Sequence, residues 1–142
     1  MLRILVAEDS PSARLFLETI MADYGRVESA VDGAQAVELF QQALDAGEPH
    51  HVVVLDIMMP VMDGLSALIK IQEIGRERGL DDEELPKSIM ASCLTDPDHM
   101  MRAHYECGAD VYLTKPYTQQ TLEEALVNLG LIANPLGEME EL

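Results

Sequence analysis

Positively charged residues are scarce in this chain, and lysine is the scarcest of them. The 142 residues include 9 Lys and Arg against 26 Asp and Glu, which gives a formal net charge of −17 at pH 7. The lysines are Lys70, Lys87 and Lys115. Proteins that bind nucleic acid directly contact its phosphates through lysine and arginine. This composition therefore argues against direct nucleic-acid binding, and the acidity affects solubility and the choice of protein partners instead.

Long apolar runs and the glycine-rich loops of nucleotide-binding proteins are also absent. The apolar runs have the length of a β-strand, whereas a membrane-spanning helix needs about 20 residues. No GxGxxG or Walker-type loop is present, which argues against a nucleotide site. Acidic residues follow the first apolar run, so the N-terminus lacks the pattern of a signal peptide. Cys93 and Cys107 show neither CxxC nor zinc-site spacing. We expect a cytoplasmic protein with reduced thiols and no membrane insertion.

Strand-like and helix-like segments alternate along the chain. The strands are expected at 2–7, 26–30, 51–55, 88–92 and 111–113. The helices are expected at 10–25, from Val37 to near Gly47, and at 65–74, 98–107 and 122–129. Five strands alternating with five helices predict an α/β fold, a doubly wound parallel sheet covered on both faces. Residues 1–130 would form this domain, and residues 131–142 a short acidic tail.

The segment VVVLDIMMPVMDG, residues 52–64, places a carboxylate at the end of the most apolar strand. A buried, unpaired charge is costly, so Asp56 is either a structural cap on the following loop or the centre of a reactive site. In a doubly wound sheet, ligands bind beyond the carboxyl ends of the strands. Other polar residues that follow predicted strands are Glu8, Asp9, Ser92 and Lys115.

Three of these residues, Glu8, Asp9 and Asp56, converge if the first and third strands are neighbours. Three carboxylates repel one another, so a cation must offset their charge. Oxygen ligands without thiolate or imidazole favour Mg²⁺, with Mn²⁺ as the alternative, over Zn²⁺. Lys115 adds a point positive charge suited to a phosphoryl oxygen, to which the Ser92 hydroxyl can donate a hydrogen bond. The set predicts phosphoryl transfer to Asp56, which forms an aspartyl phosphate.

Four motifs resemble the receiver domain of two-component response regulators. They are AED at 7–9, VLDIMMPVMDG at 54–64, GAD at 108–110 and YLTKP at 112–116. Each motif is weak alone, but the four together, in this order and at nearly the family's spacings, are specific. The resemblance implies a flavodoxin-like fold with strand order 2-1-3-4-5, of the stand-alone type seen in the chemotaxis response regulator. It also implies a sensor histidine kinase or a histidine phosphotransfer protein as phosphoryl donor, and a downstream protein as target.

The resemblance further implies a set of metal ligands. Asp9 and Asp56 resemble the family's direct Mg²⁺ ligands, and Glu8 resembles the acidic residue that acts through bound water. The backbone carbonyl of Met58 resembles a further ligand.

The remaining roles concern the phosphoryl group and the response to it. Lys115 resembles the lysine that pairs with the phosphoryl group, and the family's bond to the next residue, here Pro116, is commonly cis. Ser92 resembles the switch hydroxyl. Tyr112 resembles the switch aromatic residue, which turns inward when the hydroxyl moves toward the phosphoryl group.

The match departs from the family pattern at the fourth predicted strand. The family usually shows Thr-Ala or Ser-Ala there, whereas this chain has Ser92-Cys93 and one extra residue before Gly108. We assign Ser92 as the switch hydroxyl, with Thr95 as a substitute. A register shift of one would place Cys93 at the switch and weaken the coupling. The acidic segment 79–87 is also long, and it either lengthens the third helix or forms a partner surface.

Two other functions compete with a phosphorylated switch. An aspartate-nucleophile phosphatase usually carries a second Asp two residues after the nucleophile, and Met58 occupies that position. We therefore expect no enzyme, apart from slow self-dephosphorylation. A receiver-like interaction module that is never phosphorylated is the other alternative, because of the departure at the fourth strand. The chain ends soon after the last predicted helix, so we expect output by protein contact through 98–129. The sequence leaves the oligomeric state open.

Overall fold

A five-stranded parallel sheet forms the centre of the protein. The structure is a computed structural model, and it describes residues 1–93, 98, 101, 102 and 107–133. The strands are β1 (Leu2–Ala7), β2 (Gly25–Ala30), β3 (Val52–Leu55), β4 (Lys87–Ser92) and β5 (Val111–Thr114). Their order in the sheet is β2-β1-β3-β4-β5, and every neighbouring pair is parallel. The predicted strand order and doubly wound topology are confirmed.

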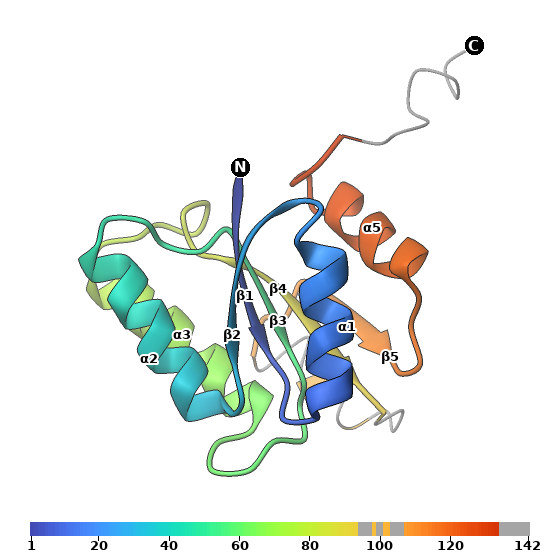
Figure 1. Ribbon diagram of the computed structural model, residues 1–142. Helices are drawn as coiled ribbons and strands as arrows, with labels where there is room; N and C mark the ends of the chain where they lie inside the picture. The colour runs from blue at the N-terminus through green and yellow to red at the C-terminus, as the bar shows by residue number, and fades with distance from the viewer. Residues whose placement is uncertain (94–97, 99–100, 103–106, 134–142) are drawn as a thin grey trace.

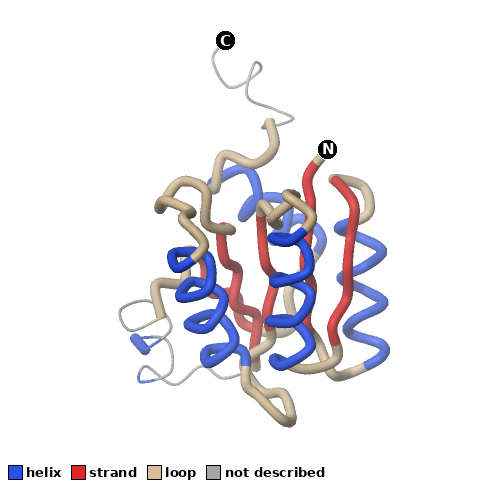
Figure 2. Tube along the Cα trace, turned by 90° about the vertical axis from the view of Figure 1, so that its left-hand side faces the viewer, coloured by secondary structure: helices blue, strands red, loops and turns tan. Residues whose placement is uncertain are grey.

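Helices cover both faces of this sheet. They are α1 (Pro11–Met21), α2 (Gly33–Asp45), α3 (Gly64–Glu77) and α5 (Gln119–Asn128). Figure 1 shows α1 and α5 on one face and α2 and α3 on the other, and Figure 2 shows the strands enclosed between the two helical layers. The helix expected at 98–107 falls largely outside the described residues. Among the described residues, every helix is too short or too polar to cross a bilayer.

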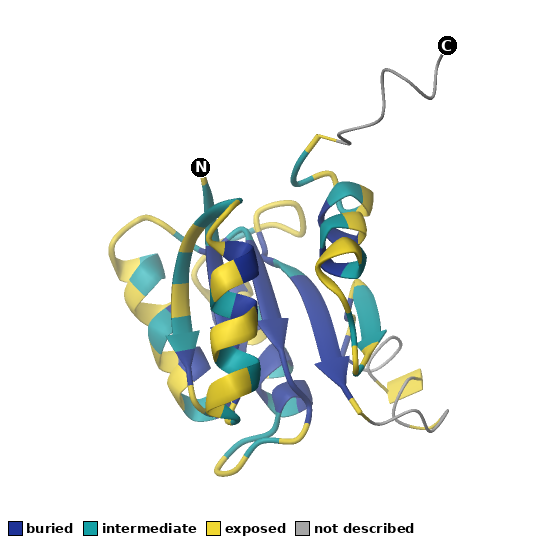
Figure 3. Ribbon diagram, turned by 45° about the vertical axis from the view of Figure 1, so that its right-hand side comes forward, coloured by how far each residue is buried: buried dark blue, intermediate teal, exposed yellow. Residues whose placement is uncertain are grey.

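The central strand β3 shows why the sheet needs cover on both sides. Side chains alternate between the faces of a strand. Val53 and Leu55 pack into the hydrophobic cluster under α2 and α3, whereas Val52 and Val54 pack into the cluster under α1 and α5. All four are fully buried, and buried residues follow the central strands in Figure 3. A strand buried on both faces reads as a continuous apolar run, as the sequence predicts.

Each described helix starts with a side-chain cap shortly after a strand or loop. The capping side chain accepts a hydrogen bond from a backbone N–H three residues later, which satisfies one free donor of the first turn. The caps are Ser10 for α1, Asp32 for α2, Asp63 for α3 and Thr118 for α5. These caps fix where each chain segment turns after leaving the carboxyl edge of the sheet.

The two ends of the parallel sheet differ in which parts of the chain lie there. The carboxyl ends of all strands lie at one end, because the strands are parallel. The start of β1 and the chain after α5 lie at the opposite end (Figure 1). There Leu2 and Leu131 pack on the same hydrophobic cluster.

Candidate functional site

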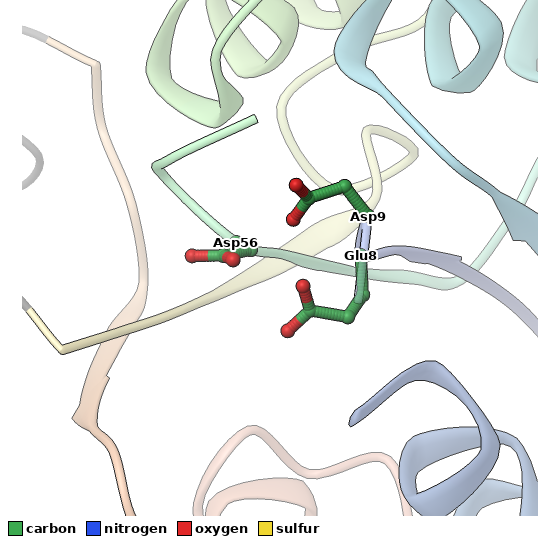
Figure 4. A group of neighbouring side chains, drawn as sticks. All are labelled: Glu8, Asp9 and Asp56. Atoms are coloured by element: carbon green, nitrogen blue, oxygen red, sulfur yellow. The ribbon is translucent and has the colours of Figure 1, made fainter. Parts of the chain in front are cut away.

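Three carboxylates meet where β1 and β3 end. Glu8 and Asp9 directly follow β1, and Asp56 directly follows β3. The two strands are neighbours with Ala7 opposite Leu55, and the Asp56 N–H donates a 3.0 Å hydrogen bond to the carbonyl of Ala7. One carboxylate oxygen from each acidic residue lies within 4.8 Å of the other two. Figure 4 shows the three side chains gathered at this edge.

Two of these carboxylates are buried. Glu8 is 1% exposed and Asp56 is 7% exposed, whereas Asp9 faces solvent. The buried Glu8 carboxylate nevertheless has a backbone hydrogen-bond donor. Its Oε2 accepts from the N–H of Ser10 at 3.2 Å. Asp56 Oδ1 accepts from the N–H of Met58 at 3.3 Å. Burial of two like charges this close requires a compensating positive charge.

Lys115 supplies part of that charge from the loop after β5. Its Nζ contacts Glu8 Oε1 and lies 3.3 Å from Asp56 Oδ2. Burial alone would lower the pKa of Lys115, but the hydrogen bond to Glu8 and the charges of Asp56 and Glu8 outweigh it. The pKa of Lys115 is therefore raised above its ordinary value. The Lys115 N–H donates to the carbonyl of Ser92 at 2.8 Å, and the bond to Pro116 is cis.

The donor set suits a small divalent cation. With the carboxylates ionised, three acidic groups and one ammonium leave a formal charge of −2 at the cluster. All side-chain donors in the cluster are oxygens, which hard ions such as Mg²⁺ prefer. The exposed Asp9 lies on the solvent side, where Mg²⁺ can keep water ligands. The residues present thus fit the predicted magnesium site.

The structure also places the other residues singled out in the sequence. Ser92 is the last residue of β4, fully buried, and pairs in register with Thr114. Tyr112 lies on β5 and packs against the cluster under α2 and α3. Met58 follows Asp56 by two residues, and it is 59% exposed.

Ser92 and Tyr112 lie on the same face of the sheet. Tyr112 pairs in register with Met90, and Ser92 lies two residues after Met90 on β4. Side chains alternate between the two faces of a strand, so residues two apart share a face. Cys93 is exposed, and the substitute Thr95 lies outside the described residues.

Two residues at the site are absent from the sequence predictions. Nη1 of Arg14 donates a 3.0 Å hydrogen bond to the carbonyl of Glu8. Gly64 lies so close to the site that a Cβ there would be 2.0 Å from the carbonyl oxygen of Asp56. The Asp-Gly pair at 63–64 is a sequence signal for this tight approach. Arg14 carries no comparable signal, because its partner is a main-chain carbonyl.

Sequence comparison relates this chain to a known protein family. The family model described as "Response regulator receiver domain" matches residues 4–127. A probable transcriptional regulator, ycf27 of Porphyridium aerugineum, is 36% identical over 122 residues, covering 85% of this chain and 45% of that protein. The sensor histidine kinase GacS of Pseudomonas protegens is 32% identical over 127 residues, covering 88% of this chain and 13% of the kinase. The chain thus spans less than half the length of these two relatives.

Solved structures show the same fold. The chemotaxis protein CheY4 of Vibrio cholerae superposes with a TM-score of 0.75 at 26% identity, covering 90% of this chain and 98% of that one. Because the family model extends over most of the sequence, the chain belongs to the response regulator receiver domains of two-component signalling.

Proposed function

We propose that this receiver domain accepts a phosphoryl group on Asp56 and that phosphorylation changes its affinity for a protein partner. The observation that carries the proposal is the convergence of Glu8, Asp9 and Lys115 on Asp56 from the ends of β1 and β5. A carboxylate that only capped a loop would not need three charged neighbours from two other strand ends.

Asp9 and Asp56 would hold Mg²⁺ directly, together with the backbone carbonyl of Met58. Glu8 would act through bound water, because its Oε1 and Oε2 already accept from Lys115 and Ser10. Bound Mg²⁺ supplies positive charge that offsets the charge of the phosphoryl oxygens. The oxygen-only donor set supports this assignment, with Mn²⁺ as an alternative ion.

The transfer itself needs an in-line nucleophile and fixed positive charge. An Oδ atom of Asp56 attacks phosphorus, the P–N bond of a phosphohistidine breaks, and the imidazole leaves with the bonding electrons. The Lys115 ammonium, whose pKa is raised by its carboxylate neighbours, pairs with a phosphoryl oxygen. The donor would be a sensor histidine kinase or a histidine phosphotransfer protein, which the similarity to a sensor histidine kinase supports. Met58 follows Asp56 by two residues and holds no proton to donate, which favours a switch with slow self-dephosphorylation over a phosphatase.

Ser92 and Tyr112 would couple phosphorylation to the partner surface. The Ser92 hydroxyl would turn toward the phosphoryl group, and the Tyr112 ring would move inward into the space released. Their placement on the same face of β4 and β5 supports this pairing. The downstream protein would read the change near β5 and α5.

Intact-mass spectrometry after incubation with acetyl phosphate tests the proposal. We expect a mass gain of one phosphoryl group that requires Mg²⁺ and is absent in Asp56→Asn. An Asp63→Asn variant is the matched control, because Asp63 caps α3 in the same loop and should keep the gain. Absence of any gain, under conditions that label another receiver domain, would leave the interaction-only module as the function.

A further inference from the structure

Asp9 is the least constrained of the three carboxylates. It is exposed, and within the described part of the chain its carboxylate makes no hydrogen bond or ion pair. Glu8 and Asp56 by contrast are buried and held by Lys115. The direction of the Asp9 side chain therefore depends on how its backbone is held.

Both peptide groups that flank Asp9 are anchored. The carbonyl of the Glu8–Asp9 peptide accepts from Nη1 of Arg14 at 3.0 Å. The N–H of the next peptide, on Ser10, donates to Glu8 Oε2 at 3.2 Å. Fixing both peptide planes fixes the two backbone dihedrals of Asp9, and with them the direction of its Cβ.

Arg14 is itself well placed for this task. It is half-buried in the first turn of α1, and its own N–H donates to the carbonyl of Ser10 at 2.8 Å. Arg14 thus donates hydrogen bonds to two backbone carbonyls, those of Glu8 and Ser10, in the turn between β1 and α1. On the β2 side, the Glu8 N–H donates to the carbonyl of Ala30 at 3.1 Å.

We propose that Arg14 is a positioning residue that raises the magnesium affinity of the site by holding the Glu8–Asp9 peptide so that Asp9 faces the ion. This inference rests on the proposed function, because it concerns the same magnesium site. The charge of Arg14 acts in the opposite direction, since a guanidinium beside a cation site repels the cation. Positioning and repulsion therefore predict changes of opposite sign when Arg14 is replaced.

Isothermal titration of the metal-free protein with MgCl₂ separates the two effects. Arg14→Met removes both the donor and the charge, whereas Arg14→Lys keeps the charge but loses the planar fork. Positioning predicts about tenfold weaker binding in Arg14→Met, as for other residues that orient metal ligands, and an intermediate loss in Arg14→Lys. Arg26→Met is the matched control, because Arg26 lies on β2 at the opposite end of the sheet, with its side chain 69% exposed. It should bind Mg²⁺ like the parent.

Tighter or unchanged binding in Arg14→Met would overturn the proposal, as would parent-like binding in Arg14→Lys. The lysine variant decides the question if Arg14→Met fails to fold, and far-UV circular dichroism shows whether it has. If the parent binds no Mg²⁺, or if Asp56→Asn binds Mg²⁺ as tightly as the parent, the proposed function is wrong instead. Normal binding in the parent with unchanged affinity in the Arg14 variants overturns only the role of Arg14.

Discussion

Nζ of Lys115 lies 3.3 Å from Oδ2 of Asp56, although 59 residues separate them in the sequence. The same ammonium contacts Glu8, which is 107 residues away. Glu8, Asp56 and Lys115 come from the ends of β1, β3 and β5, so the sheet must be assembled before the three charges meet. A bound divalent cation would compensate the same carboxylates as the ammonium, so removing the ammonium should change the stabilisation that the cation gives.

Lys115→Met should destabilise the metal-free protein and increase its response to magnesium. Removing the ammonium leaves Glu8 buried without its ionic partner, and we expect a loss of about 1–3 kcal/mol of unfolding free energy. This is below the value for a fully buried pair, because the Lys115 side chain is 26% exposed. Mg²⁺ should then stabilise the variant more than the parent. Urea unfolding with and without MgCl₂ measures both effects.

Lys70→Met is the control for Lys115, because Lys70 is exposed on α3. It should alter neither stability nor the magnesium response. Equal stabilisation of the parent and Lys115→Met by Mg²⁺ would contradict competition for the same carboxylates.

Gly64→Ala should disturb the loop that carries Asp56 directly. The added Cβ would lie 2.0 Å from the carbonyl oxygen of Asp56, a backbone atom that cannot move aside without shifting Asp56 itself. We expect a loss of about 1–3 kcal/mol of stability and slower phosphoryl gain from acetyl phosphate. Gly75→Ala is a matched control, because its Cβ would meet side-chain atoms and no backbone, the nearest being the end of the Leu85 side chain at 2.5 Å. A Gly64→Ala protein that matched Gly75→Ala in both measurements would show that the loop tolerates the extra atom.

Ser92→Ala should uncouple phosphorylation from the response, whereas Cys93→Ala should not. Ser92 is buried on the face that carries Tyr112, and Cys93 is exposed. The readout is the ¹⁹F NMR shift of fluorinated Tyr112 after incubation with acetyl phosphate, assigned with Tyr112→Phe. Ser92→Ala should keep the mass gain but lose most of the shift. If Cys93→Ala loses the shift instead, Cys93 and not Ser92 occupies the switch position at the end of β4.

Acidification below pH 6.5 should destabilise the protein in part through His50. This histidine is 2% exposed, and its Nε2 lies 2.7 Å from Oε1 of Glu28. Within the described residues, its Nδ1 has no hydrogen-bond partner. Burial lowers the pKa of His50 below 6.5, against the opposing influence of Glu28.

The unfolded chain therefore binds a proton at His50 that the folded chain does not. Stability is lost as pH falls from the unfolded pKa toward the lower folded pKa, with a ceiling of about 1.4 kcal/mol per pH unit from one group. His50→Gln should lose less stability than the parent between pH 7.5 and pH 5.5 in urea unfolding. Parallel curves for the two proteins would assign the pH dependence to other groups.

Sequence patterns predict the bounds of a helix or strand best where its side chains alone determine those bounds. β1 matches its expected bounds, because an apolar run stops at Glu8. β4 begins one residue before its expected start, because the N–H of Lys87 pairs with the carbonyl of His51 and a lysine gives no strand signal. α5 begins at Gln119, before the apolar positions, since the Thr118 cap and a polar first turn precede Leu122.

At the functional site, too, sequence patterns predict the contacts that depend on residue type and miss those made to the main chain. Asp56 and Lys115 follow strands, and the topology rule for parallel sheets predicts that they meet. The hydrogen bond from Arg14 to the carbonyl of Glu8 joins a side chain to the main chain. Any residue type supplies such a carbonyl, so residue identity carries no signal of the contact. The burial of His50 likewise depends on tertiary packing against Phe40.

The placement of the described chain ends has a practical consequence for handling the protein. The start of β1 and the chain after α5 lie at the end of the sheet opposite the acidic cluster (Figure 1). A biotin or an affinity handle joined to the N-terminus would tether the molecule with its carboxylates facing the solution. Immobilised in this orientation, the protein would present Asp56 to a soluble phosphohistidine donor, so both encounter rates and magnesium dependence become measurable on a sensor surface.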